Sequence, residues 1–291
     1  MRAEEVGKDW NVVFDSLSEC VEYCETPCVN FRPENTTELH AKLADKGIGW
    51  NGNRMMEFTS TRTWEECRDL ATRGWSKGEA MAKKLSSAMF HRVASMIQQP
   101  VFYHDVEGSD FDVARVLSGE PEVWINEYHQ TIKAPGRVVS IVYSIDASGG
   151  VPADVIAARG AAMVALVELL EQAGNAVELT VCVNTRAQYN MNMSVLVKRA
   201  GQPINLGEIA FAVAHPSMLR RVSFSVQEHS ARAWEMGCGH GYGAPGNPPE
   251  DQRGDIFLPC MTYGDAEWTK PEYAEAWLLA TLRAQGVELA C

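Results

Sequence analysis

The sequence predicts an α/β fold, in which a mostly parallel sheet carries helices on both faces and a mainly helical amino-terminal extension precedes it. From Pro135 onwards, strand-like and helix-like segments alternate, which is typical of parallel sheets. A buried-type strand, Val138–Ile145, runs into a long apolar helix, Ala153–Gln172, which Gly174 closes. Hydrophobic residues make up 46% of the 291 residues, so the chain can bury a full core.

Residues 134–291 are predicted to form the α/β domain. Two strands, 176–185 and 191–198, lie close enough along the chain to form a hairpin. The remaining segments are helical or mixed stretches at 206–213 and 217–226, a glycine- and proline-rich loop at Gly237–Pro249, a strand at Asp255–Met261, a helix at Pro271–Ala284 and a last strand at Val287–Leu289.

Residues 1–133 are predicted to be mainly helical and to pack against the α/β domain as an extension. Thr63 and Glu66 have the spacing of a capping box at the start of a helix. Apolar residues at helical spacing predict a second helix from Ser76 to about Gln98. Residues 101–124 contain glycines and a proline, so we expect only short elements there.

The charge balance limits the function classes. The formal net charge is −12, from 38 acidic and 26 basic residues, which makes generic nucleic-acid binding unfavourable. No run approaches the roughly 18 apolar residues of a membrane span, and the first residues lack an apolar signal core. We therefore expect a cytoplasmic protein. Basic residues stand together only in short pairs, namely Lys83-Lys84, Lys198-Arg199 and Arg220-Arg221.

Two other clusters carry groups that could do chemistry. Cys20, Cys24 and Cys28 stand four residues apart and could hold a soft metal, but no second distant pair completes a zinc set, so half-buried thiols are favoured. His104 lies among acidic residues up to Asp112, where metal binding or acid–base chemistry competes with a solvated acidic turn.

The best candidate site follows the strand at Val138–Ile145. Asp146 and Ser148 stand at its carboxyl end, where open α/β sheets place their ligand sites. A carboxylate and a hydroxyl are ligands that Mg²⁺ prefers, and Asp265, after a later strand, would add a second carboxylate directly or through water. The alternative is that Asp146 or Ser148 caps the following helix and that Asp265 lies in an ordinary turn.

The order of elements over residues 136–291 resembles the von Willebrand factor A-like fold, a Rossmann-like architecture. In that family a central strand ends in D-x-S-x-S and is followed by a helix, an antiparallel hairpin, more helix, and a strand that ends in an acidic loop. The resemblance implies a Mg²⁺ site that an acidic group of a partner protein completes.

Four residues of this chain correspond to that metal site. Asp146 and Ser148 match the first two positions of the motif, whereas Gly150 replaces its second serine. Asn205 is the nearest polar residue to the position of the family's downstream threonine, and Asp265 corresponds to its second aspartate loop.

A second resemblance, to a group of tailed-phage proteins with no assigned activity, spans most of the chain and implies a viral origin. It is carried by Asp105-Val106-Glu107-Gly108, Asp112-Val113, Gly119-Glu120-Pro121-Glu122, Arg159-Gly160-Ala161-Ala162 and Gly241-Tyr242-Gly243.

The expected function is therefore a cytoplasmic, phage-encoded interaction module whose strand-end crevice contacts another protein and holds a degenerate Mg²⁺ site. A Mg²⁺-dependent enzyme acting on nucleotides or nucleic acid is one alternative, and a structural subunit of a viral assembly is another. The sequence contains no recognisable hydrolytic triad or nucleotide loop, which disfavours the enzyme. It leaves the partner and the oligomeric state open.

Overall fold

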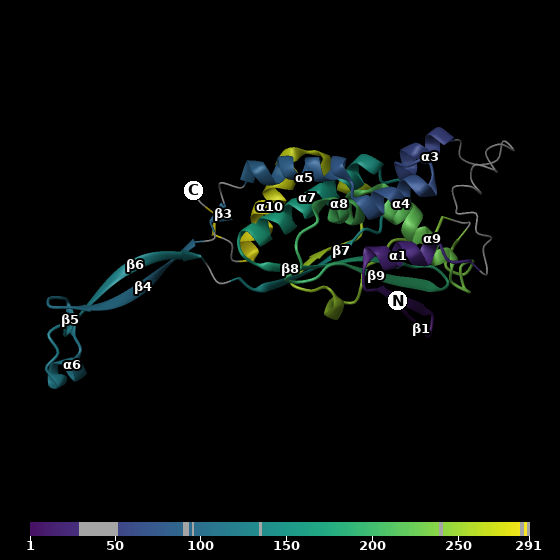
Figure 1. Ribbon diagram of the computed structural model, residues 1–291. Helices are drawn as coiled ribbons and strands as arrows, with labels where there is room; N and C mark the ends of the chain where they lie inside the picture. Colours follow the sequence, from purple (N-terminus) through teal and green to yellow (C-terminus); the bar gives the residue numbers. More distant parts are fainter. Residues whose placement is uncertain are drawn as a thin grey trace.

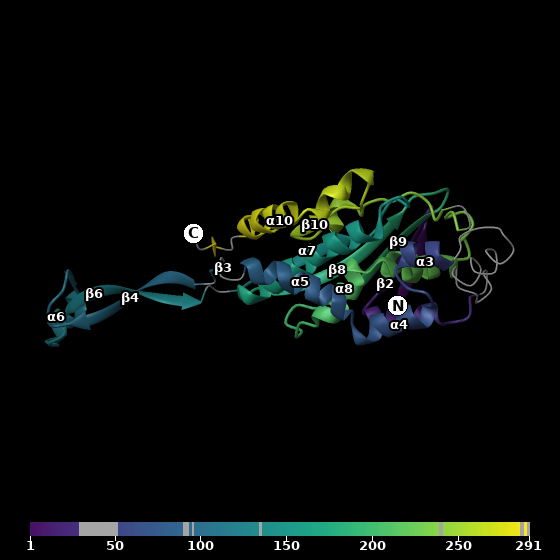
Figure 2. The same cartoon turned by 90° about the horizontal axis from the view of Figure 1, so that it is seen from above.

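The computed structural model describes residues 1–28, 52–89, 93–94, 96–133, 136–238, 241–285 and 288–289. They form a body, built on a six-stranded sheet, and a long arm that projects from one end of it (Figures 1 and 2). No helix among these residues is long and apolar enough to cross a membrane.

The body sheet has the order β1-β2-β9-β8-β7-β10. Strands β7 (Val138–Ser144), β8 (Ala176–Thr185) and β10 (Ile256–Leu258) run parallel, and β9 (Asn190–Lys198) runs antiparallel to β8, so the hairpin prediction is confirmed. The sheet then continues through β2 (Asp9–Phe14), parallel to β9, and β1 (Arg2–Val6). The amino-terminal segment thus supplies two strands of the main sheet.

The helices cover one face of this sheet, not both as the sequence analysis predicts (Figure 1). Side chains alternate along β8: Val177, Leu179 and Val181 are buried beneath the helices, whereas Glu178 and Thr180 are half-exposed on the other face. Such alternation is typical of a sheet packed on one side. Among the described residues, a loop that includes the short turn η3 (Glu250–Gln252) crosses part of the helix-free face.

The helical layer is centred on α7 (Ala153–Gln172), which follows β7. Gly160 of α7 allows a close helix crossing, because a Cβ there would lie 2.3 Å from Cα of Ala214. The other body elements are α1 (Leu17–Cys24), α3 (Gly52–Thr59), α4 (Trp64–Arg73), α5 (Ser76–Met89), α8 (Leu206–Ala214), the π-helix η2 (Met218–Ser223), α9 (Phe224–Glu228), η4 (Tyr263–Thr269) and α10 (Pro271–Ala284).

Helix starts and ends largely follow the predictions. Thr63 caps α4 by accepting a hydrogen bond from the N–H of Glu66 (3.2 Å), and α10 spans the predicted residues. The predicted helix from Ser76 to Gln98 is wrong at Val93–Ala94, which form β3, and from Met96 onwards, where the chain pairs in a β-ladder with residues 124–133.

The arm is an antiparallel ribbon of β4 (Met96–Asp105) and β6 (Trp124–Lys133), ten residues long. At its tip, β5 (Asp110–Phe111) pairs with β6, and α6 (Val113–Ser118) follows. At its root, β3 (Val93–Ala94) pairs with β11 (Glu288–Leu289), so the last predicted strand exists but lies outside the body sheet. At about 3.4 Å per residue, the ribbon alone is roughly 34 Å long.

Candidate functional site

The turn after β7 holds Asp146 in a buried position. Its carboxylate accepts hydrogen bonds from the N–H groups of Ala147 (3.0 Å) and Gly246 (3.3 Å), and its carbonyl oxygen accepts one from the N–H of Met261 (2.7 Å). Burial raises the pKa of Asp146 to about 6, and these N–H groups oppose that shift. Asp146 is therefore tied to neighbouring loops and does not cap α7, whose N-cap residue is Pro152.

Ser148 and Asp265 lie at the same edge of the sheet as Asp146. The N–H of Ser148 donates to the carbonyl oxygen of Met261 (3.1 Å), which begins the segment leading into η4. Asp265 accepts from the N–H of Thr262 (2.7 Å) within a capping box, so it organises the start of η4. This is the turn role that the sequence analysis kept as the alternative for Asp265.

Asn205 lies at the opposite end of the sheet, which corrects its placement in the predicted metal site. It follows β9, and since β9 is antiparallel to β8, the chain leaves the sheet at the end remote from Asp146. There Asn205 caps α8 by accepting from the N–H of Glu208 (3.3 Å). The part of the chain that the structure describes contains no group of three or more His, Cys, Asp or Glu side chains arranged to hold a metal.

Gly150, which stands where the family motif has its second serine, is covered by an aromatic ring. A Cβ at this position would lie 2.2 Å from Cε1 of Tyr263. A serine at position 150 would displace that ring. The position of Tyr263 therefore requires glycine where the family motif has its second serine.

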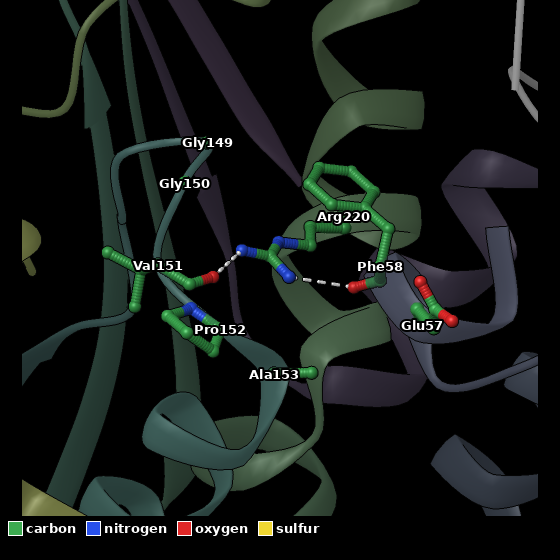
Figure 3. A pocket seen from close by; sticks show the side chains of 8 residues that line it. All are labelled: Glu57, Phe58, Gly149, Gly150, Val151, Pro152, Ala153 and Arg220. Carbon is green, nitrogen blue, oxygen red and sulfur yellow. Dashed lines mark hydrogen bonds between the residues drawn. The ribbon is translucent and has the colours of Figure 1, made fainter. Parts of the chain in front are cut away.

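A pocket of about 330 Å³ opens on the other side of the same turn (Figure 3). We call it the Arg220 pocket. It is lined by Glu57, Phe58, Gly149, Gly150, Val151, Pro152, Ala153 and Arg220. Its walls therefore come from α3, from the turn that leads into α7, and from the π-helix η2.

Arg220 is the only charged side chain of this lining that is fully buried. Its Nη1 donates to the carbonyl oxygen of Phe58 (2.8 Å) and its Nη2 to that of Val151 (2.5 Å), and the guanidinium lies 4.0 Å from the centre of the Phe58 ring. Burial lowers the pKa of Arg220 to about 10, so it keeps its charge at neutral pH. The sequence analysis recorded this residue only as half of a basic pair. Its position beside Met218, Leu219 and Val222 in a helical stretch was the available signal.

The acidic cluster around His104 serves the local structure of the arm tip. Asp112 caps α6 through the N–H groups of Ala114 (2.9 Å) and Arg115 (3.3 Å), and its other oxygen lies 3.3 Å from Nε2 of His104. Asp105 accepts a hydrogen bond from the N–H of the next residue in the chain. Hydrogen bonding, chiefly from the Arg115 N–H, lowers the pKa of Asp112.

The arm carries exposed apolar side chains despite this internal order. We call them the arm patch, and all are at least 43% exposed, with Leu117 reaching 83%. The arm patch comprises Phe102, Tyr103, Val106, Phe111, Val113, Val116, Leu117 and Tyr128. No sequence pattern singled it out, because segment 101–124 was expected to form only short elements.

The cysteine row and the glycine loop pack against α9. Cys28 donates from its thiol to the carbonyl oxygen of Glu228 (3.1 Å), and the described cysteines are free thiols. The hydroxyl of Tyr242 donates to the Glu228 carboxylate (2.5 Å), and the Tyr242 ring stacks on Phe224. Burial raises the pKa of Glu228 to about 7. In its described residues, the loop is therefore closely packed on the body.

Comparison with known families assigns the whole chain to one group. A family model described as a domain of unknown function (DUF7192) matches residues 2–288, so the chain belongs to this family. Neither the curated proteins nor the solved structures gave a match. The family match covers body and arm together.

Proposed function

We propose that the protein is an interaction module that binds a partner protein through its arm. The observation that carries the proposal is the arm patch, whose eight apolar side chains stay exposed on the ribbon and the tip of an arm that extends away from the body. Large apolar side chains that stay exposed on one projecting segment favour an interaction site, because a partner that covers them removes apolar surface from water.

The local order of the tip supports binding without large rearrangement. Helix α6 is capped by Asp112 at its start and by Gly119, in the left-handed conformation, at its end. Arg115 further ties the helix to the returning chain by donating to the carbonyl oxygen of Glu122 (2.9 Å). A preorganised surface loses less conformational entropy on association.

The charge of the tip indicates the chemistry of the partner. Between His104 and Trp124 the chain has six acidic residues, Asp105, Glu107, Asp110, Asp112, Glu120 and Glu122, and one basic residue, Arg115. An acidic rim around apolar side chains favours a partner protein with an apolar groove edged by Lys and Arg. It disfavours nucleic acid, and a second copy with a net charge of −12 would be repelled.

For the body we propose a von Willebrand factor A-like scaffold. Support comes from the order β7-α7-β8-β9-α8-β10 along the chain and from the placement of β7 between the parallel strands β8 and β10. In this proposal the body carries the arm, and the Mg²⁺ site is reduced to Asp146, Ser148 and Asp265.

The test is quantitative affinity capture from cells in which the protein naturally occurs. Wild type is compared with the double variant Val113→Ser, Leu117→Ser and with the control Val6→Ser, which removes an exposed valine from β1. We expect wild type and control to capture one protein with a basic surface. The captured amount of that protein should fall at least about tenfold with the double variant. Equal capture by all three proteins would contradict the proposal. Sedimentation of the purified proteins reports whether the arm joins two copies instead.

A further inference from the structure

The Arg220 pocket is lined by a buried cation that has no anionic partner among the residues that the structure describes. Arg220 is 3% exposed, and its two hydrogen bonds go to backbone carbonyl groups. Among the described residues, no carboxylate forms an ion pair with it. Glu57 lines the pocket, but its carboxylate lies on the far side of the Phe58 backbone from the guanidinium (Figure 3). Because a buried unpaired charge is costly, this arrangement favours an anion in the pocket.

The start of helix α7 forms the opposite wall. Its N-cap residue, Pro152, makes no side-chain capping bond and has no N–H of its own. In the first turn the N–H of Val155 donates to Oδ1 of Asp154 (3.0 Å), which leaves the N–H groups of Ala153 and Asp154 without a capping acceptor, and Ala153 lines the pocket. A helix of 20 residues also presents a partial positive charge at this end, which adds to the charge of Arg220.

The turn between β7 and α7 leaves room for a ligand close to the backbone. A Cβ on Gly149 would meet no atom within 4 Å, and Gly149 lines the pocket. The arrangement of strand, glycine turn and helix start places backbone N–H groups at the pocket wall, as in other sites that bind phosphate groups.

We propose that the Arg220 pocket binds the phosphate group of a small phosphate monoester. The guanidinium of Arg220 and the N–H groups at the start of α7 would hold the phosphate oxygens. The volume of about 330 Å³ exceeds what a phosphate ion needs and falls at the small end of ligand pockets, so it leaves room for a compact organic group.

The test is NMR titration of the full chain with phenyl phosphate, inorganic phosphate and benzoate, following the backbone amides of residues 149–151, 153 and 154. Gly149→Asp adds a carboxylate to the pocket lining, and Gly149→Asn adds a side chain of equal size without charge. Neither meets a neighbouring atom at its Cβ. Arg220→Gln removes the cation, and the two Gly149 variants decide the outcome if it fails to fold.

Wild type is expected to bind phenyl phosphate saturably, with a dissociation constant on the order of 1 mM or below, and inorganic phosphate more weakly. Gly149→Asp should weaken binding at least about tenfold, and Gly149→Asn by less than about threefold. Several results would overturn the proposal: no saturable shift in wild type, equal weakening in both Gly149 variants, benzoate binding as tightly as phenyl phosphate, or inorganic phosphate matching the monoester.

Discussion

Replacing Asp146 with asparagine should stabilise the protein at neutral and alkaline pH. Asp146 is 6% exposed, and burial raises the pKa of its carboxyl group from 3.8 to about 6. The N–H groups of Ala147 and Gly246 donate to different carboxylate oxygens, so Asp146→Asn removes the buried charge and, like the protonated carboxyl group, keeps one carbonyl oxygen as acceptor.

The magnitude follows from linkage between protonation and folding. Because the folded-state pKa is raised, Asp146 destabilises the fold only when ionised. The stability that the protonated carboxyl group allows is therefore fully present below pH 3.8 and is lost as the pH rises to about 6. At about 1.4 kcal/mol for each pH unit over this interval, the penalty is about 3 kcal/mol as an upper bound.

Urea unfolding of wild type and Asp146→Asn between pH 4 and pH 8 measures this effect. The variant should match wild type near pH 4 and exceed its free energy of unfolding by up to about 3 kcal/mol at pH 8. Asp255→Asn is the matched control, since hydrogen bonds from Ser140 lower the pKa of Asp255. This control should instead be less stable than wild type at pH 8. A destabilised Asp146→Asn at pH 8 would refute the reasoning.

Three further outcomes are expected. At a pH above 7, Glu228→Gln should raise the free energy of unfolding by up to about 3 kcal/mol, because burial raises the pKa of Glu228 from 4.5 to about 7. A difference from wild type that does not change with pH would contradict this. Gly160→Val should destabilise by at least about 3 kcal/mol or prevent folding, since its Cβ would lie 2.3 Å from Cα of Ala214, and unchanged urea unfolding would argue against that crossing. In calorimetry, we expect Mg²⁺ to bind wild type weakly and Asp146→Ala not at all. The absence of binding heat with folded wild type would contradict the proposed Mg²⁺ site.

Local periodicity predicted the carboxyl-terminal half of the fold well. The strands at 138–144 and 176–185 and the helices α7 and α10 are encoded in short-range patterns of apolar residues. The alternation of Val177 and Leu179 with Glu178 and Thr180 already indicates a strand exposed on one face. The βαβ order alone predicts helices on both faces, whereas the alternation along β8 indicates helices on one face, as the structure has them.

The arm and the edge strands depend on pairing between distant residues. Met96 belongs to a helical pattern of apolar residues, yet it pairs with Lys133 in the arm. Likewise, β2 joins the sheet beside β9, whose residues follow it by about 180 positions along the chain. Such contacts are decided by tertiary structure, which local propensity does not encode.

The candidate site was predicted in part. Asp146 and Ser148 could be located because a strand end followed by a helix fixes where they lie. Asn205 was misplaced because its position depends on the direction of β9. Arg220 was missed because arginine is seldom buried, and only the structure shows that its charge is directed into a pocket beside Asp146.

Site-specific photo-crosslinking tests the central claim most directly. A photoreactive amino acid is placed at Leu117 on the arm or, as the control, at Val6 on β1, and the protein is irradiated in the cells in which it naturally occurs. We predict that position 117 alone crosslinks to one protein, at a surface rich in Lys and Arg. Crosslinks from both positions to the same mixture of proteins, or from neither, would contradict binding through the arm.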